Sequence, residues 1–293
     1  MCISESQLQV SVIIPVYEDI KGITLTLESL RKQSLASSIF EVVVANDGGA
    51  SEVENLCDDY SVRCIDIVPN RGAYYARNRA IEQAKADNCA FVDADITVPT
   101  HWLERGLAAL EQYHYVAGGV KIEKAKIRQI ADLHEFYTAF DIRKYIQQHH
   151  FGVTANLFVR KEIFDEVGLF DERLRSSGDL EFGDRVHQYD QSIQKYASDI
   201  TVLHPPRGFR NYSKKIKRGA VGQVMLKKYY PNRFPEIDPG YGKAVVKAII
   251  PPITWLNKVY KHENIETVFL LFMFRWYVNI MRSFYIIQAL LKQ

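Results

Sequence analysis

Short apolar runs alternate with amphipathic helical stretches through the first third of the chain, and this alternation restricts the possible folds. The runs are Gln9–Val16, Phe40–Ala45, Val62–Val68 and one that opens at Ala90–Val92. Strands that are apolar along their whole length are typical of a parallel sheet covered by helices on both faces. The sequence therefore predicts a doubly wound α/β domain, with Pro15 ending its first strand.

A polar cluster follows each of these four runs. The clusters are Tyr17-Glu18-Asp19, Asn46-Asp47-Gly48-Gly49, Asn70-Arg71-Gly72 and Asp93-Ala94-Asp95. Any one of them alone is compatible with a simple turn. The carboxyl ends of parallel strands meet at one edge of a sheet, so the four clusters together predict a ligand site at that edge.

Asp93 and Asp95 are the best candidates at this edge for holding a metal ion. Two carboxylates at the end of a buried strand are costly unless a cation pairs with them. Carboxylate oxygens suit Mg²⁺ or Mn²⁺, which keep coordination positions open for substrate phosphates. His204 is a candidate third ligand because imidazole also binds Mn²⁺, although a lone histidine is more often structural.

A second acidic stretch, Gly178-Asp179-Leu180-Glu181, opens a helix after a loop of serine and glycine. Asp179 suits two roles there. It is a favoured residue for capping a helix N-terminus, and a carboxylate in this place can also act as a general base toward an acceptor hydroxyl. Arg71 and Arg77, near the third strand, match the geometry of phosphate, whereas Arg79 is expected on a helix surface.

The charge of the chain is unevenly distributed. Residues 1–204 hold 21 Lys/Arg and 31 Asp/Glu (a balance of −10), and residues 205–293 hold 16 and 4 (a balance of +12), which together give the net +2. A basic tail on an acidic body suggests an anionic partner. Nucleic acid is not expected, because no platform of basic and aromatic residues accompanies the charge.

The C-terminal region is strongly apolar as well as basic. Ile265–Leu291 is long enough to span a bilayer, but Arg275, Asn279 and Arg282 recur at helical spacing on one face. A polar face favours a helix that lies in the membrane interface or packs on protein over a simple span. The alternative is an ordinary helical subdomain with solvated lysines. Scattered cysteines and the lack of a signal peptide predict a cytoplasmic protein.

Taken together, these motifs resemble the inverting glycosyltransferases of family 2, which have the GT-A fold. The resembling stretches are SVIIPVYED (11–19), VVVANDGG (42–49), NRGAYYARNRAIEQA (70–84), AFVDADITVP (90–99), GVTANLFVRKEIFDEVGLFDERL (152–174) and SGDLEFGDRV (177–186). The resemblance implies a hexosyltransferase with a Rossmann-like, mostly parallel sheet flanked by helices. It also implies a catalytic domain at 1–207 (nucleotide half 1–98, acceptor half 99–207), and residues 208–293 follow as a helical appendage.

The resemblance implies a nucleotide-sugar donor, a UDP-sugar by family frequency, and a glycan or lipid-linked acceptor near the inner face of the plasma membrane. On the nucleotide side it implies Glu18 or Asp19 together with Asp47 for the base and ribose, and Arg77 beside them. The expected nucleotide contacts are Pro15, Tyr17, Glu18, Asp47, Arg71, Arg77, Asp93 and Ala94.

The same resemblance assigns the metal and acceptor residues. Asp93 and Asp95 match the DxD motif, with Asp95 as the direct ligand of Mn²⁺ or Mg²⁺, and His204 matches a metal-binding histidine of some members. Asp179 matches the second residue of the ED motif and would be the base. Gly178 stands where glutamate is frequent, so Glu181 is expected to supply the missing charge. The acceptor set is then Asn156, Gly178 and Glu181.

Two other functions fit parts of the sequence. Asp93-Ala94-Asp95-Ile96-Thr97 fits the DxDxT signature of haloacid-dehalogenase-like phosphatases, in which the first Asp is the nucleophile. That motif normally ends the first strand of its sheet, however, and here three strand–helix units precede it. The other alternative is a catalytically inactive, sugar-binding homologue at a membrane surface, which the presence of both DxD and Asp179 disfavours.

Overall fold

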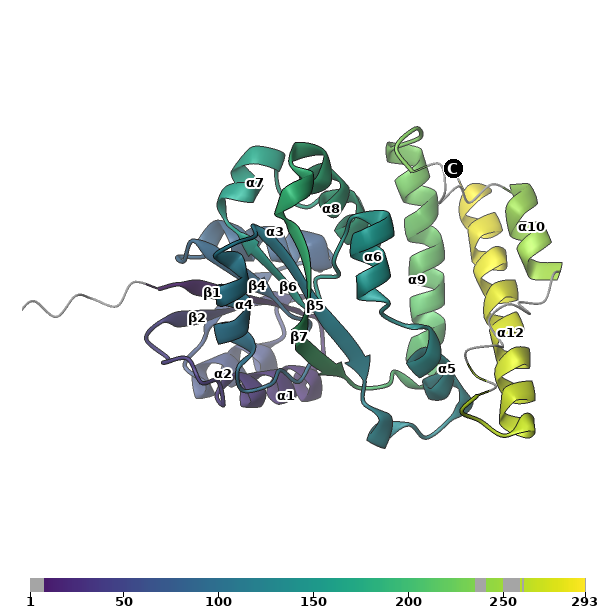
Figure 1. The fold of residues 1–293 in the computed structure, drawn as a ribbon, viewed down its shortest axis with the longest axis horizontal. Coiled ribbons are helices and arrows are strands. Elements are labelled where there is room, and N and C mark those ends of the chain that lie inside the picture. Colours follow the sequence, from purple (N-terminus) through teal and green to yellow (C-terminus); the bar gives the residue numbers. More distant parts are fainter. Residues whose placement is uncertain (1–7, 235–240, 250–258, 260, 293) are drawn as a thin grey trace, which may run out of the picture. The chain divides into compact units, whose positions relative to one another are not determined.

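The computed structural model describes residues 8–234, 241–249, 259 and 261–292, which form two compact units (Figure 1). The first unit takes in residues 1–121, 140–173 and 178–204, and the second takes in 122–139, 174–177 and 205–293. The first contains the sheet, and the second is helical.

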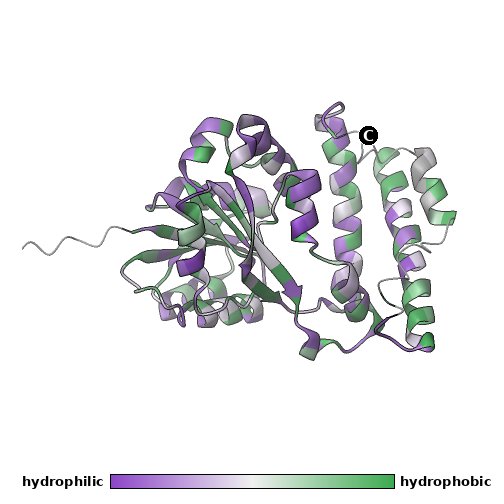
Figure 2. Cartoon of the chain, in the orientation of Figure 1, coloured by the Kyte–Doolittle hydropathy of each residue, from purple (hydrophilic) through white to green (hydrophobic). Residues whose placement is uncertain are grey.

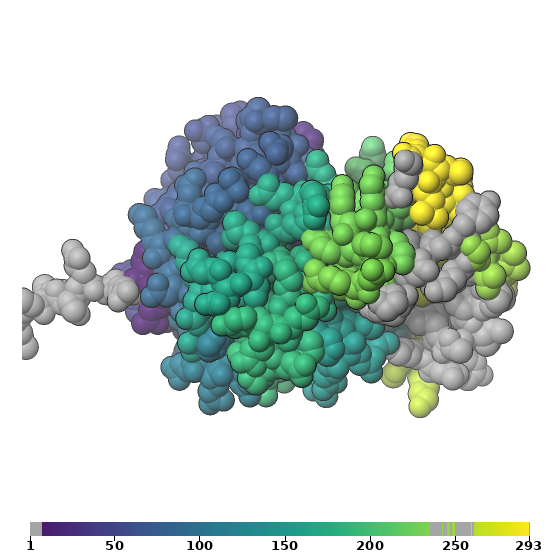
Figure 3. All heavy atoms as spheres, turned by 90° about the horizontal axis from the view of Figure 1, so that it is seen from above, coloured from purple at the N-terminus to yellow at the C-terminus, as the bar shows by residue number. Residues whose placement is uncertain are grey.

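The first unit alternates strands and helices in the predicted way. Its elements are β1 (Val10–Val16), α1 (Ile20–Leu30), β2 (Phe40–Asp47), α2 (Ser51–Asp59), β3 (Arg63–Ile67), α3 (Ala73–Gln83), β4 (Asn88–Phe91), α4 (Trp102–Leu110), β5 (Tyr115–Ile122), α6 (Ile142–His149), β6 (Leu157–Arg160), α7 (Glu162–Val167), α8 (Gly178–Tyr189), the 3-10 turn η2 (Gln191–Ile193) and β7 (Gln194–His204). Figure 3 shows one face of this unit, where segments of its first half (blue) lie against segments of its second half (teal).

The strands of this unit form a single mixed sheet. Its order is β3-β2-β1-β4-β6-β5-β7. The pairs β3–β2, β2–β1 and β1–β4 are parallel, whereas β6 runs antiparallel to both β4 and β5. The carboxyl ends of β1, β2, β3 and β4 therefore lie at one edge of the sheet, as the polar clusters predicted.

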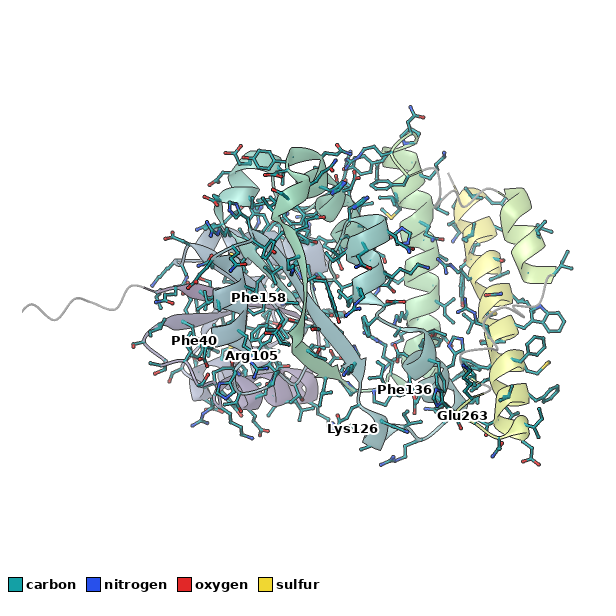
Figure 4. The ribbon with its side chains drawn as sticks, viewed as in Figure 1. Phe40, Arg105, Lys126, Phe136, Phe158 and Glu263 are labelled. Carbon is teal, nitrogen blue, oxygen red and sulfur yellow. The ribbon has the colours of Figure 1, made fainter. Side chains whose placement is uncertain are left out.

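Alternate residues of β4 and β6 build a core on each face of the sheet. Phe91 points toward α7 and α8, where it packs edge-on against Phe164 and Phe170. Phe158 points to the other face, where its ring lies 4.8 Å from that of Trp102 on α4 (Figure 4). Because side chains alternate along a strand, both sides of the sheet are buried, and the strands have to be apolar throughout.

Pro15 does not end the first strand as predicted. β1 continues through Pro15 to Val16, in register with β2. The pairing of β1 with β4 ends at Ile13, whose carbonyl accepts the last bond from Val92 N–H at 3.3 Å. The backbone polar groups of residue 15 face β4, as those of Ile13 do. Because the pairing with β4 has already ended at Ile13, the missing N–H of Pro15 removes no hydrogen bond from the sheet.

The second unit consists of η1 (Lys124–Lys126), α5 (Ile130–Thr138), α9 (Gly208–Tyr229), α10 (Tyr241–Ile249) and α12 (Ile265–Leu290). α5, α9 and α12 share a core of buried residues, which are Ala131, Tyr212, Ile216, Phe274 and Val278. Figure 2 shows α12 as largely apolar with polar positions near its middle. Within the part of the chain that the structure describes, no helix combines the length and hydropathy that a bilayer crossing requires.

Two helices, α5 and α6, lie between β5 and β6, and Phe140, with a left-handed φ of 59°, separates them. Asp141 then caps α6 by accepting a hydrogen bond from Lys144 N–H at 3.4 Å. The break lies at the border between the two units, so residues 122–139 belong to the helical second unit and not to the unit that contains the sheet. The two units therefore do not coincide with the expected division at residue 207, although the last border falls close to it.

Candidate active site

The loop that carries the DxD motif is held against α1. Thr26 Oγ1 donates to the carbonyl of Ile96 at 2.8 Å. Gly22 packs so closely that a Cβ atom there would lie 3.0 Å from the carbonyl oxygen of Ala94. These contacts fix the backbone of residues 93–96 and so fix where the two aspartates lie.

The Asp93 carboxylate is paired with a buried arginine. Arg77 Nη2 lies 2.6 Å from Asp93 Oδ1, and the arginine side chain is 5% exposed against 34% for the aspartate. A buried guanidinium needs a counter-charge, and Asp93 supplies it. Arg77 and Asp93 thus lie together at the sheet edge, and the guanidinium of Arg77 balances the negative charge of Asp93.

Asp95 faces His204 from across the sheet edge. The distance between Asp95 Oδ2 and His204 Nε2 is 3.6 Å, and the histidine is fully buried at the end of β7. Two ligands at right angles around an ion, each about 2.1 Å from it, are about 3.0 Å apart. At 3.6 Å the two atoms are further apart than this, so a small movement of the Asp95 side chain would bring them to two adjacent corners of a Mn²⁺ or Mg²⁺ site.

The predicted three-ligand set is not assembled in the structure. Among the described residues, no group of three His, Cys, Asp or Glu side chains is placed to hold one metal ion. The physical reason is the pairing of Asp93 with Arg77, which directs that carboxylate to a different partner. The structure brings together Asp95 and His204, and the role of Asp93 as a metal ligand remains a prediction.

The Asp179 carboxylate lies in the first turn of α8, partly buried. It accepts hydrogen bonds from Thr154 N–H at 3.3 Å and from Thr154 Oγ1 at 3.2 Å. Burial raises its pKa and the nearby charge of Asp93 adds to the increase, against the opposing effects of Arg77 and of the hydrogen bonds from Thr154 and Tyr74. A raised carboxyl pKa is what a general base needs to compete for a hydroxyl proton.

The structure separates the two acids that follow β1. Asp19 is the N-cap of α1 and accepts from Gly22 N–H at 2.9 Å. Glu18 has a left-handed φ of 50°, and both acids are exposed, so the contact of either one with a nucleotide remains a prediction. Tyr17 is exposed beside Gly48, at which a Cβ would come within 3.0 Å of the tyrosine ring.

Asp47 organises the third polar cluster. Its carboxylate accepts from Asn70 Nδ2 at 2.8 Å, from Arg71 N–H at 2.6 Å and from Gly72 N–H at 2.8 Å. These bonds tie the end of β2 to the loop before α3. The guanidinium of Arg71 lies 4.4 Å from the ring centre of Tyr75 and remains exposed, as a phosphate contact requires. Direct contacts of Asp47 and Arg71 with a nucleotide remain predictions.

Two residues predicted for the acceptor side, Asn156 and Glu181, are buried in the structure. Asn156 is fully buried, accepts from Trp102 Nε1 at 2.9 Å and donates to the carbonyls of Gly119 and Ile200. Glu181 is 1% exposed and pairs with Arg185 one helical turn later, with Nε to Oε1 at 2.9 Å. Asn156 and Glu181 thus have hydrogen-bond partners within the fold, and their contact with an acceptor remains a prediction.

Sequence reasoning missed Tyr74 and Thr154, which are the hydrogen-bond partners of Asp179. Tyr74 is 8% exposed, and its hydroxyl accepts from Asp179 N–H at 3.3 Å. Thr154 lies in the loop before β6 and contacts the same carboxylate. Neither has a signal in the sequence, since each is more than twenty positions from Asp179 and only the fold brings them together.

A groove elsewhere in the first unit is unrelated to these residues. It has a volume of about 760 Å³ and is lined by residues such as Gln9, Asn88 and Arg160. Gln9 precedes β1 and Asn88 begins β4, so the groove lies at the opposite edge of the sheet from the DxD loop.

Comparisons with known proteins agree with this geometry. The profile of glycosyl transferase family 2 matches residues 11–168, which is more than half of the chain. Glycosyltransferase AglE of Haloferax volcanii is 30% identical over 224 residues, covering 74% of this chain and 73% of the relative. This match excludes the phosphatase alternative. In that alternative Asp93 would be the nucleophile, whereas in the structure it pairs with Arg77.

Solved structures share the fold at low identity. Mannosyltransferase PcManGT of Pyrobaculum calidifontis, in complex with GDP-Man and Mn²⁺, superposes with a TM-score of 0.63 at 16% identity, covering 97% of this chain and 86% of that chain. TarS 1–349 of Staphylococcus aureus, in complex with UDP-GlcNAc, superposes with a TM-score of 0.57 at 17% identity, covering 98% and 93%. The predicted GT-A fold is confirmed, and the chain is a glycosyltransferase that belongs to glycosyl transferase family 2.

Proposed function

We propose that the chain transfers a sugar from a nucleoside diphosphate donor, a UDP-sugar, to a hydroxyl of a glycan or lipid-linked glycan, with inversion at the anomeric carbon. One observation carries the proposal: a carboxyl with a raised pKa, Asp179, lies near Arg77 and Asp93, at the sheet edge that also holds Asp95 and His204. Nucleotide-sugar complexes of two structural neighbours support the donor class.

The residues divide the reaction between them. Asp179 accepts the proton of the acceptor hydroxyl as the oxygen attacks the anomeric carbon. Attack from the side opposite the departing diphosphate inverts that carbon in one displacement. Arg77 and Asp93 hold the donor side of the site, and Glu18 and Arg71 face outward beside it to contact the nucleotide.

Asp95 and His204 fit a divalent cation. Their facing atoms are a carboxylate oxygen and an imidazole nitrogen, a mixed set that Mn²⁺ accepts more readily than Mg²⁺. Such ions leave coordination positions for water and substrate phosphates, so two protein ligands are sufficient. A cation bound there would neutralise the charge that builds on the diphosphate leaving group.

An anionic membrane surface is the proposed location of the acceptor, with the protein peripheral at the inner face of the plasma membrane. α12 and its C-cap residue Leu291 present exposed apolar residues at helical spacing, here called the α12 stripe: Ile265, Phe269, Met273, Ile280, Phe284 and Leu291. Of the two arginines of α12, Arg275 is partly buried near Tyr212 and Arg282 is exposed. An apolar stripe on a region with a balance of +12 suits a helix lying on anionic lipid.

A donor screen followed by product analysis tests the reaction. Thermal shift with UDP-, GDP- and dTDP-sugars in Mn²⁺ should identify the donor, because a bound ligand stabilises the folded state by mass action. NMR of the product made from that donor is expected to show an inverted anomeric configuration. A product with the anomeric configuration of the donor would contradict the single displacement.

A further inference from the structure

The N-terminus of α8 is capped by a residue from another helix. Tyr74, the second residue of α3, accepts hydrogen bonds on its hydroxyl oxygen from the N–H groups of Gly178 and Asp179, the latter at 3.3 Å. The first N–H groups of a helix have no partner within the helix, and a short polar side chain just before it usually supplies one. Here a phenol more than a hundred positions away supplies it.

The carboxylate of Asp179 is held by a second residue. It accepts hydrogen bonds from Thr154 N–H at 3.3 Å and from Thr154 Oγ1 at 3.2 Å. The Tyr74 hydroxyl therefore fixes the backbone of the proposed base, and Thr154 fixes its side chain. A carboxylate held by two donors keeps one orientation, which is what proton transfer in a transition state requires.

The tyrosine ring explains why residue 178 is glycine. A Cβ atom at Gly178 would lie 2.6 Å from Cε2 and 2.7 Å from Cζ of Tyr74, far inside van der Waals contact. The ring cannot move aside easily, because it stacks on Phe170 at 5.7 Å and the guanidinium of Arg77 lies 5.7 Å from its centre. A glutamate at 178 and a tyrosine at 74 thus exclude each other in this backbone.

We propose that Tyr74 is the positioning residue for Asp179 in this chain, and that residue 178 has to be glycine to make room for the tyrosine ring. The proposal rests on the proposed function, since it concerns the base of that reaction. Through its contact with Arg77, the same ring also joins the base to the donor side of the site.

The first test removes only the Tyr74 hydroxyl. Tyr74→Phe keeps the ring but loses the hydroxyl that accepts from Asp179 N–H, so kcat is expected to fall at least tenfold while the donor KM changes less than twofold. The drop should remain smaller than that of Asp179→Asn. Tyr60→Phe, in the turn after α2, is the control and should match the wild type.

Amide hydrogen exchange of residues 178–181 reads the cap without any activity. Tyr74→Phe is expected to speed this exchange at least tenfold, with no change in a peptide from α4. Unchanged exchange together with unchanged kcat would overturn the proposal. If Tyr74→Phe speeds the exchange but the wild-type protein turns over no sugar nucleotide, the capping role of Tyr74 stands and the proposed function is refuted.

A double-mutant cycle tests the fit between ring and glycine. Gly178→Ala should lower the melting temperature clearly in the wild type but hardly at all in Tyr74→Ala, because the alanine methyl then occupies the space of the missing ring. Additive losses in the two backgrounds would show that Tyr74 does not determine residue 178, and would overturn that part of the proposal.

Discussion

The Asp179 carboxyl lies in surroundings that favour its protonated form. Burial, the largest effect, and the negative charge of Asp93 both raise its pKa. Its folded-state pKa is therefore above the ordinary value of about 3.9 for aspartate. The stability gained from the protonated form is fully present below that ordinary value and is lost as the pH rises through the folded-state pKa. At neutral pH the ionised base therefore costs the fold stability, as is common at active sites.

Asp179→Asn should separate activity from stability. We expect kcat to fall by about 10² to 10⁴, the usual contribution of a general base. The melting temperature at pH 7 should be equal to or above that of the wild type, and the difference should shrink as the pH is lowered. Steady-state kinetics and thermal unfolding measure the two effects. Full activity, or a melting temperature several degrees lower, would contradict the role given to this carboxyl.

At the residue level, the sequence indicates which polar residues lie near the sheet edge but not which partners they have. Asp95, His204 and Asp179 can be proposed from the sequence because each lies at the end of a strand or in the first turn of a helix. The partners of Asn156 and Glu181 cannot be predicted, since a polar residue in a loop or first turn looks the same whether its partners are substrate or core. Only three-dimensional contacts distinguish these two cases.

Among the elements, α5 belongs to the helical second unit, and buried ion pairs hold it there. Glu135 on α5 is 1% exposed and pairs with Arg207 Nη1 at 2.5 Å and with Lys215 Nζ at 2.8 Å. Burial alone would raise its pKa, but the two cations lower it to about 2. Since the folded-state pKa is depressed, this stability is present above the ordinary glutamate value of about 4.3 and is lost as the pH falls toward 2.

Glu135→Gln should weaken the second unit. Removing one partner of a buried ion pair leaves the others uncompensated and costs about 3 kcal/mol. We expect denaturant unfolding at pH 7 to show a loss of this order. Glu123→Gln is the matched control, because Glu123 pairs with Lys126 at 2.8 Å with both side chains substantially exposed, and its change should stay within about 0.5 kcal/mol. Equal effects of the two substitutions would contradict the anchoring role of Glu135.

Element prediction succeeded where the pattern was local. The apolar runs of β1, β2 and β4 were found because each is buried on both faces. The break between α5 and α6 is harder to predict. It depends on the left-handed backbone of Phe140 and on the Asp141 cap, and only the cap has a signal in the sequence.

For the molecule as a whole, the charge asymmetry and the α12 stripe suggest attachment to a surface. Phe269→Ser/Phe284→Ser removes two large apolar side chains, which are 61% and 53% exposed. Burying one such side chain is worth about 1.5–3 kcal/mol, so the bound fraction on vesicles containing phosphatidylglycerol should fall at least fivefold in a sedimentation assay. Leu25→Ser, an exposed apolar residue of α1, is the control. A double variant that sediments like the wild type would contradict membrane attachment through this stripe.

The most direct test of the central claim is a calorimetric titration with UDP, GDP and dTDP in Mn²⁺ and in excess chelator. Asp95 and His204 face each other at 3.6 Å, so at least one nucleotide should bind at least tenfold more tightly with Mn²⁺. The Asp95→Ala variant should lose that enhancement while keeping its fold. Equal affinity with and without the metal, or an enhancement that survives Asp95→Ala, would contradict the claim.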